Sequence, residues 1–230
     1  HFVATDEYKN RVIQLGEIPR KVYLVGGLGV DTIKKTKFYK KEYLEKKMGF
    51  KLGKKNILVN FHSVTLEKNQ SKKQIKEILK ALKKIKDIRI IFTMPNADHD
   101  SKIIYEEINN FVKRNKNSTV YKSLGSLAYL SCLKFVNVIL GNSSSGLLEA
   151  PTLKVPTINI GNRQKGRLKA KSVIDCQPKQ KKIYSNLIKI LNEKRKNASN
   201  KFKNPYGEGG ASKKIINILE NINYNNILKK

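Results

Sequence analysis

The sequence contains no tryptophan, only two cysteines, and no apolar run that could cross a membrane. Its longest apolar run, residues 136–140 (VNVIL), has the length of a strand, whereas a membrane-spanning helix needs about 20 apolar residues. Cys132 and Cys176 each lie in an apolar segment and fit neither a disulfide framework nor a metal motif. We therefore predict buried free thiols, no membrane segment and a cytoplasmic location.

Acidic residues are also scarce: 18 Asp and Glu stand against 48 Lys and Arg, a formal net charge of +30. Such an excess favours an anionic partner, either nucleic acid, a membrane surface or a phosphorylated substrate. However, the basic residues are mostly Lys spread over most of the chain, without zinc-finger spacing, an Arg-rich arm or an RNA-recognition signature. We interpret the charge mainly as compositional bias that still attracts a diphosphate. A basic nucleic-acid-binding protein is the alternative, based on charge alone.

The chain starts at His1 without an initiator Met, and its first residues (HFVATDEY) match neither a signal peptide nor a leader. We therefore expect it to be part of a longer protein. Its 230 residues suffice for one large domain or two small ones with a buried core.

Segments typical of strands and helices alternate along most of the sequence. The predicted strands are short and apolar, at 21–26, 56–61, 88–92, 119–121, 136–140 and 157–160. The predicted helices, several with one apolar face, are at 71–86, 101–115, 126–135, 144–150, 182–192 and 212–222, with a mostly helical polar segment at 36–54. This alternation indicates an α/β fold with a Rossmann-like, doubly wound parallel sheet of about six strands.

Ligands of such a sheet bind at the carboxyl ends of its strands, so the loops there carry the candidate site. The loop after segment 56–61 begins with His62. A His there can contact a phosphate or a sugar hydroxyl, although it can equally cap a helix or lie in the core. The loop MPNADHD superficially resembles a calcium loop, but it lacks the Gly and the distant Glu of that motif, so we predict no metal site there.

The strongest candidate is segment 141–151 (GNSSSGLLEAP). Its hydroxyl-rich turn leads from a strand into a helix, where backbone N–H groups and the hydroxyls of Ser143, Ser144 and Ser145 can bind an anion. Glu149 lies about one helical turn further on, where a carboxylate can accept hydrogen bonds from ribose hydroxyls. A plain Ser cap of the helix is the alternative, and the Lys-Ser/Thr ending of a P-loop is absent.

Two further loops are basic or rich in glycine. The loop 161–167 (GNRQKGR) includes Arg163 and suits a diphosphate or, alternatively, an exposed basic turn. The loop 204–212 (NPYGEGGAS) runs into the last helix and could form a second phosphate cradle, unless Tyr206 is a packing residue. The sequence offers no convincing pair of catalytic carboxylates, Ser-His-Asp order or metal cluster, so it is typical of a nucleotide-holding domain.

Several segments, taken in order, resemble the hydrolysing UDP-N-acetylglucosamine 2-epimerases of sialic-acid biosynthesis. They are HFVATDEYKNRVIQLGE, VGGLGVD, NFHSVT, GNSSSGLLEAP, VPTINIGNRQKGR, AKSVIDC and NPYGEGGAS. The resemblance covers nearly the whole chain, and GNSSSG…EAP with NIGNRQKGR is its most specific part. The non-hydrolysing branch of this family has an Asp-Ser-Gly-Gly turn that this chain lacks.

The resemblance implies the second domain of a two-domain glycosyltransferase-B fold. Residues 1–200 would then be a Rossmann-like nucleotide-binding domain, and residues 201–230 a C-terminal loop and helix packing back toward a missing N-terminal domain. The family's acid/base carboxylates lie mostly in that first domain. The resemblance also implies a homo-oligomer and no cofactor, metal, nucleic-acid partner or membrane association.

The same resemblance assigns roles to residues. It implies that Ser143–Ser145 bind the diphosphate, Glu149 the ribose and Arg163 the phosphates or the sugar, with His62 as a catalytic residue near the diphosphate and hexose. The implied reaction converts UDP-N-acetylglucosamine and water to N-acetylmannosamine and UDP, by elimination of UDP and addition of water. The alternatives are a hydrolysing 2-epimerase of a UDP- or GDP-linked 2,4-diacetamido sugar and a retaining glycosyltransferase of the same architecture.

Overall fold

The computed structural model describes residues 1–64, 67, 69–95, 100–193 and 202–222. The chain divides into two compact units: unit 1 joins His1–Thr36 to the residues from Asn204 onward, and unit 2 is Lys37–Lys203. As functional domains, the ranges 1–200 and 201–230 stay predictions. Within the described ranges, every helix is too short or too polar to span a membrane.

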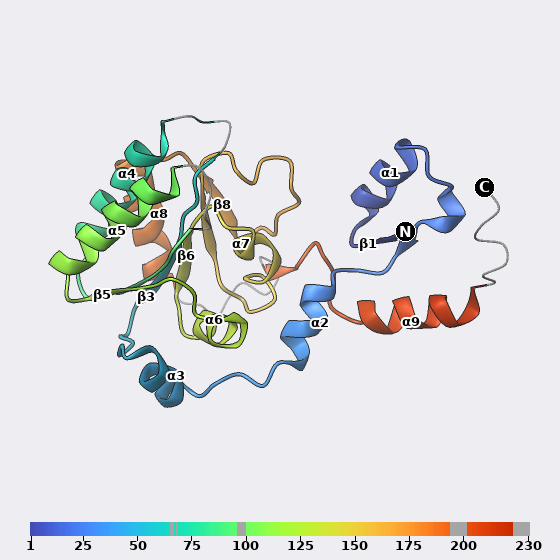
Figure 1. Cartoon of the computed structure of the whole chain (residues 1–230), viewed down its shortest axis with the longest axis horizontal. Coiled ribbons are helices and arrows are strands. Elements are labelled where there is room, and N and C mark those ends of the chain that lie inside the picture. The colour runs from blue at the N-terminus through green and yellow to red at the C-terminus, as the bar shows by residue number, and fades with distance from the viewer. Residues whose placement is uncertain (65–66, 68, 96–99, 194–201, 223–230) are drawn as a thin grey trace. The chain divides into compact units, whose positions relative to one another are not determined.

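Among the described residues, unit 2 contains a six-stranded parallel sheet (Figure 1). Its strands are β3 (Asn56–Asn60), β4 (Arg89–Thr93), β5 (Ser118–Tyr121), β6 (Val138–Gly141), β7 (Thr157–Ile160) and β8 (Val173–Cys176). They are ordered β5-β4-β3-β6-β7-β8, and all neighbours are parallel. Numbered within this sheet, the order is 3-2-1-4-5-6, which is that of a doubly wound Rossmann fold. The predicted fold class is confirmed.

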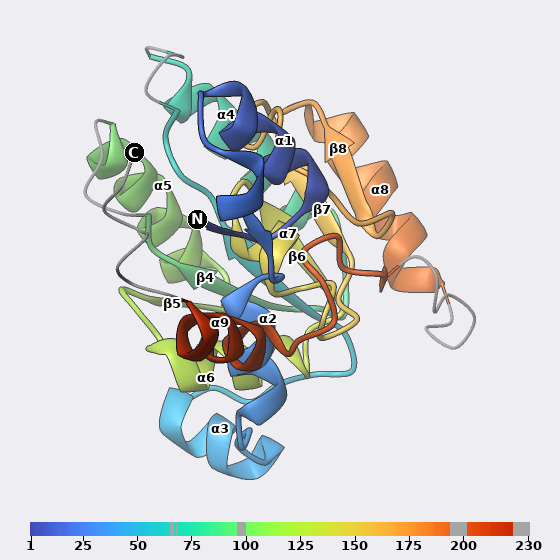
Figure 2. The same cartoon turned by 90° about the vertical axis from the view of Figure 1, so that its right-hand side faces the viewer.

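Helices cover both faces of this sheet. The first face carries α4 (Ser71–Lys83), α5 (Ser101–Arg114) and α8 (Gln180–Asn192), and the second carries α6 (Ser126–Leu133) and α7 (Ser145–Leu148), with α3 (Lys41–Met48) beside α6 (Figure 1). Figure 2 shows α5 near the β5 edge and α8 near the β8 edge. All five residues of β3 are buried because a central parallel strand is covered on both sides.

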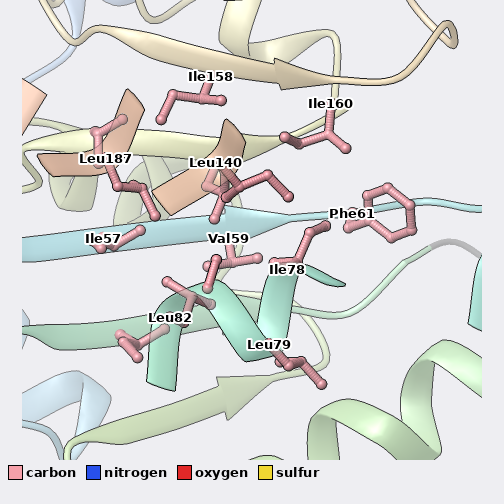
Figure 3. Packing of buried hydrophobic residues seen from close by; sticks show 14 of the residues in the cluster. Ile57, Val59, Phe61, Ile78, Leu79, Leu82, Leu140, Ile158, Ile160 and Leu187 are labelled. Atoms are coloured by element: carbon pink, nitrogen blue, oxygen red, sulfur yellow. The ribbon is translucent and has the colours of Figure 1, made fainter. Parts of the chain in front are cut away.

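The main core lies between the sheet and the first of these faces. Figure 3 shows Val59 of β3, Leu140 of β6 and Leu187 of α8 within one apolar cluster, and each is fully buried. Burying such a side chain contributes about 1.5–3 kcal/mol relative to exposing it. The tightly packed core therefore fixes the positions of the carboxyl ends of β3 and β6.

Two strand predictions require correction. Segment 21–26 does not belong to the main sheet: only β2 (Tyr23–Leu24) forms there, and it pairs with β1 (Phe2–Val3) in unit 1. The sixth strand of the main sheet is β8, which the sequence analysis missed because the exposed Asp175 interrupts its apolar pattern at the edge of the sheet.

Unit 1 contains α1 (Asp6–Gln14), α2 (Leu28–Lys35) and α9 (Ala211–Asn221). The last helix was predicted, whereas α1 and α2 were not. No residue of α1 is buried. It begins after Thr5, whose hydroxyl accepts a hydrogen bond from the Tyr8 N–H at 3.2 Å.

Candidate functional site

The candidate site lies where the order of the sheet reverses. β3 and β6 are neighbours in the sheet although two other strands separate them in sequence. Ligands of doubly wound folds bind in the crevice beyond the carboxyl ends of two such strands. The loop after β3 carries His62 and the loop after β6 carries Ser143–Ser145, so two predicted loops meet at this position.

A glycine permits the close approach of the two strands at this point. Gly141 pairs with Asn60 in the register and has a φ of +146°, and a Cβ there would overlap the carbonyl group of Asn60. The Asn142 N–H donates a hydrogen bond to the backbone carbonyl oxygen of Asn60 at 3.0 Å. The chain can therefore turn away from β6 only with glycine at residue 141.

Asn142 connects segment 141–151 to the loop that begins with His62. Its side chain is 1% exposed. Its Oδ1 accepts a hydrogen bond from the His62 N–H at 2.7 Å, and its Nδ2 donates to the His62 carbonyl oxygen at 2.8 Å. Because both polar atoms of the amide are satisfied, the backbone of His62 is fixed beside the turn formed by Ser143–Ser145, here called the Ser turn.

The loop after β7 joins the same cluster. Arg163 donates from Nη1 to the Asn142 carbonyl oxygen at 3.1 Å, and Gln164 donates from Nε2 to the same oxygen at 2.8 Å. Gln164 is 2% exposed, and its Oε1 has no hydrogen-bond partner among the described residues. Three of the predicted loops thus converge on one residue, Asn142.

The other cations of the 161–167 loop are arranged differently. Lys165 and Arg167 are exposed, whereas Lys169, just beyond the loop, forms an ion pair with Asp175 at 2.6 Å. Lys165, Lys169 and Asp175 line a cavity of about 360 Å³ at the carboxyl ends of β7 and β8. Ser143–Ser145 do not line it. Arg163 connects the basic loop to segment 141–151 through its bond to the Asn142 carbonyl oxygen.

The Ser turn itself is ordered by short backbone contacts. The Ser143 carbonyl accepts the Gly146 N–H at 3.3 Å, and α7 starts at Ser145. The N–H groups of Ser143 and Ser144 have no acceptor among the described residues. Ser143 and Ser144 are half-buried and Ser145 is buried, so donors remain available on one side of the turn.

Glu149 follows the Ser turn with one unsatisfied oxygen. Its Oε2 is buried and has no hydrogen-bond partner in the described part of the chain. Buried carboxylate oxygens are normally hydrogen-bonded, so such an atom indicates a place for a donor. The position of Glu149 beside the turn is the one that the sequence predicted.

A tyrosine that the sequence analysis did not single out reaches the same turn. Tyr129 of α6 donates from its hydroxyl to Ser145 Oγ at 2.6 Å. Burial raises the pKa of Tyr129 well above its ordinary value, and the nearby charge of Glu149 raises it further. Asn142, Gln164 and Tyr129 were all missed. The first two stood inside predicted motifs, whereas Tyr129 gave no signal beyond that of an apolar helix.

The predicted second phosphate cradle is occupied by the protein itself. In unit 1, Asp31 Oδ1 accepts hydrogen bonds from the N–H groups of Gly210 at 2.5 Å and Ala211 at 3.3 Å, and Oδ2 accepts from Ser212 N–H at 2.7 Å. These bonds, with that of the Ser212 hydroxyl, lower the pKa of Asp31 to about 2. Tyr206 is 6% exposed and packs against Tyr8. This loop is therefore a carboxylate-capped helix start and not a phosphate cradle.

The remaining predictions concern metals and thiols. Residues 96–99 of the MPNADHD loop lie outside the described residues. The described ranges contain no group of three or more His, Cys, Asp and Glu residues that could hold a metal. Cys132 and Cys176 are buried free thiols, as predicted. Burial raises the pKa of Cys132 to about 12, so this thiol stays protonated and is not a nucleophile.

Comparison with protein families supplies an independent finding. Residues 1–220 match the family model described as UDP-N-acetylglucosamine 2-epimerase. The chain is similar to the "GDP/UDP-N,N'-diacetylbacillosamine 2-epimerase (hydrolyzing)" of Campylobacter jejuni, with 41% identity over 178 residues, 77% of this chain and 46% of the relative. It is similar to the "Polysialic acid biosynthesis protein P7" of Escherichia coli, with 38% identity over 221 residues, 96% of this chain and 56% of the relative.

A third relative is the "UDP-N,N'-diacetylbacillosamine 2-epimerase (hydrolyzing)" of Legionella pneumophila, 31% identical over 222 residues, which cover 96% of this chain and 57% of the relative. The chain thus spans about half the length of the curated relatives it matches.

Solved structures share the fold at low sequence identity. The S. aureus MnaA–UDP co-structure has a TM-score of 0.75 at 18% identity and covers 100% of this chain and 62% of that one. The Neisseria meningitidis UDP-GlcNAc 2-epimerase bound to UDP-GlcNAc has a TM-score of 0.71 at 20% identity, with 96% and 60% covered. These neighbours have the glycosyltransferase-B type of fold, and at such identities they establish the fold alone.

Proposed function

Because the chain belongs to the UDP-N-acetylglucosamine 2-epimerase family, we propose that it forms the nucleotide-binding part of a hydrolysing sugar-nucleotide 2-epimerase. The observation that carries this proposal is the convergence of three loops on Asn142 at the reversal of the sheet. This convergence places the donors of the Ser turn, the Arg163 guanidinium and the backbone of His62 in one cluster.

The cluster suits a nucleoside diphosphate. We assign Ser143–Ser145 to the diphosphate, because the hydroxyls and the N–H groups of Ser143 and Ser144 are hydrogen-bond donors. Arg163 uses one of its five N–H donors on Asn142 and has others for a phosphate or a sugar oxygen. Glu149 Oε2 would accept a hydrogen bond from a ribose hydroxyl and so satisfy its buried oxygen. His62 would act near the diphosphate and the hexose.

The reaction that we propose starts with elimination. The C2 proton of the sugar is removed, the C1–O bond breaks, and the nucleoside diphosphate leaves with both electrons of that bond. Donors from the Ser turn and Arg163 stabilise the charge that develops on the departing diphosphate. Water then adds to the glycal with a proton returned to C2 from the opposite face, which gives the free 2-epimeric sugar. The net charge of +30 also attracts the anionic substrate.

Proton transfer at C2 requires acid/base groups that are positioned at the sugar. The described residues offer no convincing carboxylate pair beside the Ser turn, and the relatives are about twice as long as the matched segments. We therefore propose that these carboxylates belong to an N-terminal domain outside this chain. A homo-oligomer remains a prediction from the family resemblance.

Two substrates fit the proposal. UDP-N-acetylglucosamine is the substrate that the family resemblance implied. A UDP- or GDP-linked 2,4-diacetamido sugar is the second candidate, and it is favoured by the names of the relatives that are 41% and 31% identical. Both reactions use the same elimination, so they differ in the nucleobase and at C4 of the sugar.

A product assay on the intact protein tests the proposal. Each sugar nucleotide is incubated with the protein in D2O, and NMR identifies the released sugar and the isotope at C2. We expect release of the nucleoside diphosphate and a free 2-epimeric sugar carrying deuterium at C2. Transfer of the sugar to an acceptor with its configuration retained at C1, without deuterium, would identify a retaining glycosyltransferase and overturn the proposal.

A further inference from the structure

Tyr129 makes a side-chain contact with the Ser turn. Its hydroxyl lies 2.6 Å from Ser145 Oγ and 3.5 Å from Asn60 Oδ1. The mode for O–H···O bonds is about 2.7 Å, so the bond to Ser145 is the principal one. Ser145 is 9% exposed, which leaves little water to compete with Tyr129 for this hydroxyl.

The direction of this hydrogen bond follows from the distances of the two acceptors that face the Tyr129 hydroxyl. Asn60 donates from Nδ2 to Thr93 Oγ1, so the atom that it presents to Tyr129 is the acceptor Oδ1. Burial raises the pKa of Tyr129, and the phenol therefore keeps its proton. Of the two acceptors that face the phenol, Ser145 Oγ at 2.6 Å is much nearer than Asn60 Oδ1 at 3.5 Å, so the single phenol proton is donated to Ser145. No described residue accepts the proton of the Ser145 hydroxyl.

We propose that Tyr129 is a positioning residue that holds the Ser145 hydroxyl as a hydrogen-bond donor toward a phosphate oxygen of the nucleotide. The inference rests on the proposed function, because it presumes a diphosphate at the Ser turn. A hydroxyl that already accepts from Tyr129 is oriented before the ligand arrives, so less rotational freedom is lost on binding.

The polarity of the turn fits a nucleoside diphosphate in particular. Among the described residues, Ser145 presents a proton without an acceptor, and Glu149 Oε2 is a buried acceptor without a donor. A nucleoside diphosphate supplies both partners, since its phosphates only accept hydrogen bonds and its ribose hydroxyls donate. Inorganic phosphate in its dianionic form and uridine each satisfy one half of this pattern.

Calorimetric titration of the intact protein with UDP and with uridine tests the inference. We expect Tyr129→Phe to weaken UDP binding about fivefold to tenfold, the value of one ordinary hydrogen bond. Ser145→Ala should weaken it about tenfold to a hundredfold, since its bond reaches a charged oxygen. Neither variant should change uridine binding. The double variant should bind UDP as Ser145→Ala does, because Tyr129 acts through Ser145.

Tyr121→Phe is the matched control. Tyr121 of β5 donates its hydroxyl to the Met48 carbonyl oxygen, also at 2.6 Å. The control loses the same atom and a similar hydrogen bond, so its melting temperature should fall as for Tyr129→Phe while UDP affinity is retained. If both Phe variants lose UDP affinity equally, the effect is one of stability and the inference is overturned.

The single variants separate this inference from the proposed function. Wild-type UDP affinity in Tyr129→Phe, combined with a clear loss in Ser145→Ala, overturns the role of Tyr129 and leaves the diphosphate site in place. Additive losses in the double variant also overturn it, because Tyr129 would then act independently of Ser145. Wild-type affinity in Ser145→Ala overturns the phosphate role of Ser145 in the proposed function as well.

Discussion

The Asn142 side chain and the His62 backbone form a reciprocal pair of hydrogen bonds, at 2.7 Å and 2.8 Å, across the carboxyl ends of β3 and β6. The pair imitates one rung of a strand ladder at a point where the two chains have already left the sheet. It holds the loop that contains His62 against the Ser turn. The carbonyl oxygen of Asn142 simultaneously accepts from Arg163 and Gln164.

The first prediction concerns this pair. Asn142→Asp keeps the acceptor for the His62 N–H but places a carboxylate oxygen opposite the His62 carbonyl oxygen. We expect a loss of about 1–3 kcal/mol in the free energy of unfolding, measured by chemical denaturation, and a loss of UDP affinity of about tenfold, equivalent to 1.4 kcal/mol.

Asn56→Asp is the control for Asn142→Asp. Asn56 lies at the other end of β3, where its Nδ2 donates to the carbonyl oxygens of Gly53 and Phe135. The control should be destabilised in the same way and should bind UDP normally. If Asn142→Asp binds UDP as tightly as this control, the hydrogen-bonded pair does not organise the site.

The second prediction concerns Glu149. Glu149→Ala removes the buried unpaired oxygen and should weaken UDP binding about tenfold, because a hydrogen bond between a ribose hydroxyl and a carboxylate contributes about 1.5–3 kcal/mol. The variant should bind 2',3'-dideoxy-UDP as the wild type does, as measured by calorimetry. Equal losses with both ligands would remove the ribose role of Glu149.

The third prediction concerns Arg163. Arg163→Ala should weaken UDP binding about tenfold or more and leave uridine binding nearly unchanged, because a charge-assisted bond to phosphate is lost. Arg167→Ala, in the same loop but exposed, removes the same charge without that contact and should have a small, salt-dependent effect. A similar loss in the two variants would assign the effect to net charge.

The fourth prediction concerns Asp31 and pH. Its hydrogen bonds lower the pKa from 3.8 to about 2, so the ionised form stabilises the folded state. This stabilisation is complete above the unfolded pKa and is lost as the pH falls from about 4 to about 2. At pH 7, Asp31→Asn should cost about 2 kcal/mol of unfolding free energy.

The difference between Asp31→Asn and the wild type should shrink toward pH 2 in denaturation series at several pH values. The exposed Asp87 provides the control, since Asp87→Asn should change the free energy of unfolding at pH 7 only slightly. A cost for Asp31→Asn that is the same at pH 2.5 and at pH 7 would argue against the capping role of the carboxylate.

The sequence predicted the main sheet well because its central strands are buried on both faces. The run NILVN leaves no polar side for solvent, and β3 forms at residues 56–60 as expected within one residue. The edge strand β8 was missed because Asp175 faces solvent there. Edge strands are exposed on one side, so their apolar signal is weaker.

The sequence predicted the loop motifs of the candidate site, but it did not reveal the side chains that hold these loops in place. His62, Ser143–Ser145, Glu149 and Arg163 stood in loops that local composition marked as polar. Tyr129 acts through a residue 16 positions away, and this pairing depends on how α6 packs beside α7. Asp31 caps a helix 179 residues further along the chain, which no local pattern records.

The most direct test of the central claim is calorimetric titration of the intact wild-type protein with UDP, UMP and uridine at physiological salt. We predict that affinity rises in the order uridine, UMP, UDP, because the Ser turn and Arg163 hold the diphosphate. UDP affinity should also fall much more on substitution of Arg163 than of Arg167. Equal binding of UDP and uridine, or an absence of UDP binding, would contradict a diphosphate site at the carboxyl ends of β3 and β6.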